Sequence, residues 1–315
     1  MRAFKYSAIG SLFILTACGG GSSGPAVDDP VVTPAPTPAS LTLNVSDAPV
    51  DDALAVVVEF DSIELTGNGD PIVYNVTDEQ GGARQIDLLA FQGEDFATLL
   101  DSVEIEAGTY GQLRLNVTNN SFIEMTSGTF DLRVPSNQLK LDGFTIDESE
   151  QALYTVEFDL RKSLVAPPGQ DAILLKPRGV RVVENSEAGT IAGTVDESLL
   201  VVEQCADKVD IAVGNAVYIY AGTDFTLDVL GDDADEPADI NEISPVAIGE
   251  VSLNTDTEYA FEVAYLPVGD YTVGFTCLAA NDEPETDENV ADGFSILLQQ
   301  SVSVSAQQRV SVTFE

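Results

Sequence analysis

The sequence predicts an all-β protein built from two tandem β-sandwich domains. Short segments in which apolar and polar residues alternate recur along the chain, and turns rich in glycine, proline and aspartate separate them. The composition, 44% hydrophobic, is that of a globular protein. A chain of 315 residues has room for about two domains of ~150 residues, each large enough to bury a core.

The balance of charge excludes several classes of function. The chain has 53 acidic and 13 basic residues, a formal net charge of −40. Such a surface repels nucleic acid and anionic lipid headgroups, so we expect no nucleic-acid partner. At ~1 M salt the Debye length falls to about 3 Å, which screens the self-repulsion, so we expect a marine or halotolerant source.

Two residue types are absent from the sequence. Without histidine, the chain has no Ser-His-Asp or Cys-His catalytic set and no His-ligated zinc. Without tryptophan, it lacks the best stacking surface for sugars, although tyrosine and phenylalanine remain.

Residues 1–18 have the three parts of a signal peptide. Arg2 and Lys5 supply the positive charge, 8–15 form an apolar run, and small residues precede Cys18. The apolar run is shorter than the ~20 residues that span a bilayer. Leu15-Thr16-Ala17-Cys18 resembles a bacterial lipobox, which implies a diacylglycerol on Cys18 and a membrane partner for the protein. Gly19 favours the outer membrane by the same resemblance. The alternative is an ordinary signal peptide with a chance cysteine.

Residues 19–40 predict a tether. Their first part is rich in glycine and serine and is typical of a flexible coil. Their second part alternates proline with threonine and alanine, which favours a stiffer polyproline spacer.

Residues 41–184 predict the first sandwich. We expect strands at 41–45, 53–60, 72–76, 103–105, 110–117, 129–134, 153–160 and 173–183. In 153–160 the apolar set is Tyr154, Val156, Phe158 and Leu160. We expect Arg178 and Arg181 to face solvent. Residues 94–101 have the pattern of a short helix.

Residues 189–315 predict the second sandwich, after a boundary near 184–189. Of the 13 basic residues, Lys208 and Arg309 alone lie beyond that boundary. The expected strands are 190–195, 216–220, 258–265, 271–277, 294–298 and 301–314.

Two resemblances follow from these residues. The opening Leu43-Asn44-Val45-Ser46-Asp47-Ala48-Pro49-Val50-Asp51, with Ile86-Asp87-Leu88-Leu89, Ala107-Gly108-Thr109-Tyr110 and Leu113-Arg114-Leu115, resembles the domain of unknown function 4382 family. The resemblance implies a β-sandwich and supplies no activity and no catalytic residue.

The second domain resembles a carboxypeptidase regulatory-like module, a prealbumin-type sandwich. The matching pieces are Gly189-Thr190-Ile191-Ala192-Gly193-Thr194-Val195, Ala216-Val217-Tyr218-Ile219-Tyr220 and Leu266-Pro267-Val268-Gly269-Asp270-Tyr271-Thr272-Val273. The resemblance implies a structural or binding appendage. The insertion at 221–257 is longer and more acidic than such a module leads us to expect.

Both domains contain a Gly-x-Tyr step, at Gly108/Tyr110 and at Gly269/Tyr271. Glycine permits a tight turn, and the tyrosine hydroxyl can hold the next strand. Two interpretations account for the repetition: the two sandwiches are related, or the same kind of turn occurs independently in each.

The cysteines predict one disulfide. Lipidation uses Cys18, which leaves Cys205 and Cys277 in an oxidising compartment. A bridge between them closes a loop of about 70 residues and contributes roughly 4 kcal/mol. The alternative is two buried thiols.

Acidic loops are the candidate metal ligands. Asp232, Asp233, Asp235 and Asp239 cluster on one loop, and oxygen ligands of this kind suit Ca²⁺. Residues 282–288 form a second acidic loop. The spacing is not that of an EF-hand, and a solvated surface loop is the alternative.

The sequence as a whole predicts a lipid-anchored outer-membrane protein with a non-enzymatic binding or structural role. An envelope protein and a polysaccharide are the candidate partners, and no catalytic residue and no cofactor other than Ca²⁺ is expected. The competing hypotheses are a carboxylate-based extracellular glycan hydrolase and a Ca²⁺-dependent polysaccharide-binding protein.

Overall fold

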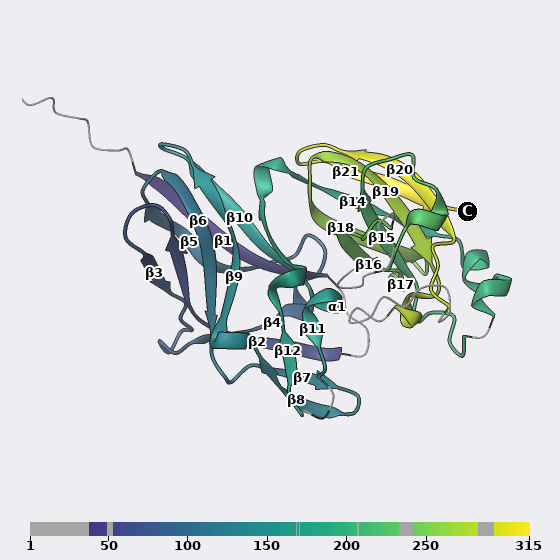
Figure 1. Cartoon of the computed structure of the whole chain (residues 1–315), viewed down its shortest axis with the longest axis horizontal. Coiled ribbons are helices and arrows are strands. Elements are labelled where there is room, and N and C mark those ends of the chain that lie inside the picture. Colours follow the sequence, from purple (N-terminus) through teal and green to yellow (C-terminus); the bar gives the residue numbers. More distant parts are fainter. Residues whose placement is uncertain are drawn as a thin grey trace, which may run out of the picture. The chain divides into compact units, whose positions relative to one another are not determined.

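The computed structural model describes residues 38–48, 53–167, 169, 171–206, 208–232, 242–282 and 293–315. All of them belong to one compact unit, Pro36–Glu315. Nearly all of the regular secondary structure in the described residues is β-strand, so the predicted all-β fold class is confirmed (Figure 1). None of their helices is long and apolar enough to cross a membrane.

The first sandwich packs two sheets face to face. One sheet has four strands in the order β5 (Ala97–Ile105), β1 (Ala39–Ala48), β10 (Gln151–Asp159) and β13 (Val180–Glu184). The path of the other runs β9 (Gln138–Ile146), β6 (Gly108–Val117), β2 (Ala53–Thr66), β7 (Phe122–Met125), β8 (Gly128–Arg133), β12 (Ile173–Leu175) and β11 (Leu164–Val165). Strands β3 (Ile72–Asn75) and β4 (Arg84–Asp87) also pair with β2. The helix α1 (Leu160–Ser163) follows β10.

The alternation seen in the sequence builds the core of this sandwich. Leu41, Leu43 and Val45 of β1 point inward, as do Val156 and Phe158 of β10, and all five are fully buried. The inward-facing set predicted for 153–160 is therefore confirmed.

The second sandwich also packs two sheets, each of four strands. The first has the order β17 (Ser252–Leu253), β18 (Tyr259–Pro267), β14 (Ala188–Val195) and β21 (Arg309–Phe314). The second has the order β16 (Ala247–Glu250), β15 (Ala216–Ala221), β19 (Gly269–Thr276) and β20 (Leu298–Val304). Ile191, Val217, Val273, Phe275 and Val312 form part of the core between them.

The two sandwiches share the order of three strands in each sheet. In the first, β1 pairs parallel with the late strand β10 and antiparallel with β5. In the second, β14 pairs in the same two ways with β21 and β18. The opposite sheets match as well, because β6 lies between β2 and β9 as β19 lies between β15 and β20. The hairpin β7–β8 is an addition of the first sandwich.

Described residues of the insertion at 221–257 pack on the outer face of β15. Tyr218 and Tyr220 lie on that face, fully buried beneath Leu230, Ile243 and other apolar residues. The Tyr220 hydroxyl donates to the carbonyl of Gly231 at 2.6 Å, and the Tyr218 hydroxyl donates to Asp282 at 2.5 Å.

Three local expectations are wrong. The expected helix 94–101 is instead a loop followed by β5, because pairing with β1 prevails over the weak helical pattern. Of the expected strand 294–298, Leu298 alone belongs to a strand, as the first residue of β20. The expected strand 301–314 is divided between β20 and β21. The expected strand 173–183 is broken by a 3₁₀ turn, Pro177–Gly179.

Candidate binding hollow

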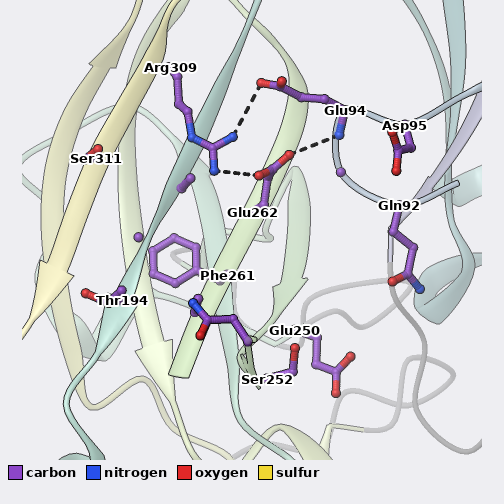
Figure 2. Close-up of a pocket in the computed structure, with 15 residues that line it drawn as sticks. Gln92, Glu94, Asp95, Thr194, Glu250, Ser252, Phe261, Glu262, Arg309 and Ser311 are labelled. Atoms are coloured by element: carbon purple, nitrogen blue, oxygen red, sulfur yellow. Dashed lines mark hydrogen bonds and ion pairs between the residues drawn. The ribbon is translucent and has the colours of Figure 1, made fainter. Parts of the chain in front are cut away.

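A hollow of about 650 Å³ lies over the outer face of the sheet that contains β14, β18 and β21. Its floor consists of the outward-facing side chains of these strands. Ala192 of β14 stands between Glu262 of β18 and Ser311 of β21, and in the next row Thr194 lies opposite Ala260. Small side chains at the centre of the floor leave the space open. We call this cavity the main hollow (Figure 2).

One wall of the main hollow is the loop 92–95 of the first sandwich. Ser46 of β1 holds this loop, because its Oγ lies 2.7 Å from the carbonyl oxygen of Asp95 and 3.1 Å from that of Phe91. Gly93 has a φ of +62°, and a Cβ there would lie 2.6 Å from Oε1 of Glu262. Glycine is therefore required where the loop approaches β18.

Arg309 joins the loop to the floor. Its Nη2 lies 2.6 Å from Oε2 of Glu262, and its Nη1 lies 3.6 Å from Oε1 of Glu94 (Figure 2). The same two carboxylates accept further hydrogen bonds: Glu262 from the backbone N–H of Glu94 at 3.1 Å, and Glu94 from the hydroxyl of Thr190 at 2.8 Å. Both carboxylates are thus bound on one side of the hollow.

Tyr265 of β18 holds the loop 92–95 through a hydrogen bond. Its hydroxyl donates to the carbonyl of Glu94 at 3.0 Å, and its ring packs with Val183, Ala188 and Ala264. Burial raises the pKa of Tyr265 to about 12, partly offset by hydrogen bonding with Ser46. The phenol is therefore neutral at ordinary pH and acts as a donor to the loop.

Arg181 makes a second set of contacts between the two sandwiches. Nε of Arg181 on β13 lies 2.8 Å from the buried Glu157, and its guanidinium donates to the carbonyls of Val246 and Ala264, each at 3.3 Å. Burial raises the pKa of Glu157 and of Asp159, although Arg181 opposes the shift at Glu157 and the Lys162 N–H opposes it at Asp159. These carboxyls are structural.

This arrangement corrects the expectation for the arginines. Arg181 does not face solvent, because its guanidinium lies between Glu157 of β10 and the carbonyls of Val246 and Ala264 in the second sandwich. Arg178 does not point freely outward either, because its Nε donates to the carbonyl of Lys162.

The predicted site residues have different outcomes. The structure joins Cys205 and Cys277 in a disulfide, with a Cα–Cα distance of 5.9 Å. Cys18, Asp233, Asp235 and Asp239 lie outside the described residues. Asp232 is buried at the base of its loop. Within the described ranges, no group of three or more acidic, histidine or cysteine side chains is placed to hold a metal ion.

Sequence reasoning missed the main hollow. Glu262 and Arg309 occupy outward positions of ordinary amphipathic strands, and nothing in their spacing links them to Glu94. The one available signal was Gly93 beside three polar residues, Gln92, Glu94 and Asp95, in a segment with no strand pattern.

Comparisons with solved structures yield similarities too weak to carry an argument. The TIE protein of Bacillus anthracis has 13% identity and a TM-score of 0.19, and the alignment covers 89% of this chain and 34% of that one. The minor pilin GBS52 of Streptococcus agalactiae has 10% identity and a TM-score of 0.19, with 87% and 94% covered. A putative adhesin of Bacteroides ovatus has 9% identity and a TM-score of 0.18, with 96% and 98% covered. The chain thus spans about a third of the length of the TIE protein.

Comparison with curated proteins gives no match. A family model does match the first sandwich over residues 38–177, most of the expected range 41–184. Residues 38–177 therefore form a DUF4382 domain, a family described as a domain of unknown function.

Proposed function

We propose that this protein is a lipid-anchored, non-enzymatic envelope module that binds a neutral polysaccharide in the main hollow. The observation that carries the proposal is the set of partners that the carboxylates of Glu94 and Glu262 have in the main hollow. Glu94 and Glu262 interact with Arg309, a threonine hydroxyl and a backbone N–H, so their charge is partly compensated and both serve as hydrogen-bonding groups.

The rest of the lining suits a ligand rich in hydroxyl groups. Gln92 and Asn254 offer amides, and Thr194, Ser252 and Ser311 offer hydroxyls, so the lining contains both donors and acceptors. Its volume falls in the range of ~300–1,000 Å³ typical of ligand sites. With four carboxylates and one guanidinium, the lining disfavours an anionic chain.

The position of the carboxyl groups with raised pKa values favours a binding function over a hydrolytic one. A general acid must remain protonated and reach the substrate. Glu157 and Asp159 have raised pKa values, but both are buried and neither lines the main hollow.

The anchor and the class of the second sandwich belong to the same proposal. The lipobox-like Leu15-Thr16-Ala17-Cys18 supports lipidation and an outer-membrane location. The Gly189–Val195 and Leu266–Val273 motifs, now on β14 and on β18–β19, support a carboxypeptidase regulatory-like module.

The anchor is tested in whole cells. Wild-type protein should partition into detergent and carry a diacylglycerol-sized mass on its N-terminal peptide. Cys18→Ala should appear in the aqueous phase. Recovery of unmodified wild-type Cys18 would contradict the anchor and leave the binding site untouched.

Polysaccharide binding is tested by filling the main hollow. Thr194→Trp places a large side chain on the floor without removing a described contact, and it should weaken binding of neutral glucans by at least about tenfold. Thr66→Trp, at a similarly half-buried strand position of the first sandwich, is the matched control. Affinity electrophoresis with malto-, cello- and laminari-glucans measures the effect. Equal binding by both variants, or release of reducing ends by the wild type, would overturn the proposal.

A further inference from the structure

A second hollow of about 370 Å³ adjoins the main one. Phe96, Asn185, Tyr265, Gln307 and Gln308 contribute to its lining, and we call it the Phe96 hollow. Glu94 and Arg309 line both hollows. The contact between these two side chains is therefore the partition that separates the cavities.

The ion pair that forms this partition is weak. The Glu94–Arg309 distance is 3.6 Å, and the two side chains are 58% and 49% exposed. An ion pair this exposed contributes little to stability. The backbone of Glu94 is held separately, by the hydroxyl of Tyr265 and by Glu262. The contact of the Glu94 carboxylate with Arg309 can therefore break while the loop stays in place and the hydroxyl of Thr190 remains a partner of that carboxylate.

Phe96 gives the second hollow a surface that the main hollow lacks. Its side chain is 48% exposed, and among the described residues it is the one aromatic in the exposed class of large apolar side chains. In the main hollow the lining aromatic, Phe261, is 4% exposed and faces the core. An exposed ring beside amide side chains suits the apolar face of a sugar ring, whose rim hydroxyls the amides bind.

We infer that the two hollows form one extended site for a linear oligosaccharide, with Phe96 as its stacking platform and the Glu94 side chain as a displaceable partition. This inference rests on the proposed function and adds the length and polarity of its ligand. A short sugar occupies the main hollow alone, whereas a longer chain displaces the Glu94 carboxylate from Arg309 and reaches Phe96.

The test is the dependence of affinity on chain length, measured by calorimetry with a disaccharide and a hexasaccharide of the glucan that binds. Wild-type protein should bind the hexasaccharide at least about tenfold tighter. Phe96→Ala should remove most of that advantage. Glu94→Gln keeps an acceptor for Thr190 and removes the ion pair, so it should tighten hexasaccharide binding by up to about fivefold. Val73→Ala, an exposed apolar residue on β3 that lines neither hollow, is the control.

The outcomes separate the two proposals. If wild-type protein binds neither sugar, the proposed function fails. If it binds both equally, and Phe96→Ala matches Val73→Ala, the main hollow stands and the extension is overturned. Because Phe96 is half exposed, Phe96→Ala is expected to fold, and circular dichroism checks this.

Discussion

Tyr265 shows how one residue connects the two sandwiches. It has a φ of 53°, an uncommon backbone conformation for a tyrosine, and its hydroxyl reaches the carbonyl of Glu94. The wall of the main hollow therefore depends on a phenol from the opposite domain. Its raised pKa makes this dependence measurable.

Removal of the Tyr265 hydroxyl should have an effect that depends on pH. A folded-state pKa of about 12, above the usual 10, means that the contribution of the phenol is complete below about pH 10 and is lost as pH rises toward 12. Tyr265→Phe should cost about 0.5–1.5 kcal/mol near pH 8, and the deficit should shrink near pH 11. Urea unfolding of both proteins at each pH measures it; a deficit that grows with pH would contradict the assignment.

The buried pair Glu157–Arg181 gives a second prediction, in which the destabilisation shrinks as pH falls. Arg181→Leu leaves Glu157 buried without its cation, so its already raised pKa rises further. The loss should be about 3–5 kcal/mol at neutral pH and should diminish as pH falls toward the unfolded value near 4.5, because protonation relieves the charge. Thermal unfolding across that range tests it. A loss independent of pH would show that Glu157 is not the affected group.

At the scale of elements, the Gly-x-Tyr step performs the same task in both sandwiches. The Tyr110 hydroxyl donates to the carbonyl of Glu106 at 2.8 Å, and the Tyr271 hydroxyl donates to that of Pro267 at 2.7 Å. In each case the acceptor lies four residues earlier, across the turn between two facing sheets. The expected role of the tyrosine hydroxyl is thus confirmed.

Each of these hydroxyls should contribute a similar free energy. Tyr110→Phe and Tyr271→Phe should each reduce the free energy of unfolding by about 0.5–1.5 kcal/mol, since each leaves a carbonyl without this donor. Urea titration followed by circular dichroism gives the values. Tyr74→Phe, which removes a more exposed bond to the carbonyl of Glu104, should cost less. An equal cost for all three would remove any special role for the turn.

The sequence predicts a strand or helix correctly where the side chains of that segment alone determine its conformation. Strands with inward-facing valine, leucine and phenylalanine, such as β1 and β10, follow from alternation because burial selects one face. The segment 94–101 does not, because β1 and Ser46 determine its conformation from a distance. The main hollow was beyond reach for the same reason, since Glu94, Glu262 and Arg309 meet only after both domains have folded.

The whole molecule carries a charge that should make its stability depend on salt. A net charge of −40 repels itself, and salt screens that repulsion with a Debye length of about 10 Å at 0.1 M and about 3 Å at 1 M. The melting temperature should therefore rise between dilute buffer and sea-salt concentration. Differential scanning calorimetry in sodium chloride measures it. A melting temperature that falls or stays constant would contradict the halotolerant interpretation.

The common strand order of the two sandwiches has a geometric consequence. Part of the outer face of β10 and β1 in the first is buried, at Ser46, Thr155 and Glu157, whereas the equivalent face of β21 and β14 is the floor of the main hollow. A tandem array in which each member covers the face of the one before it always ends on one uncovered face, however many members it has. In this chain the last member supplies that face, the loop 92–95 of the first sandwich covers part of it, and the polar floor is the part that stays open.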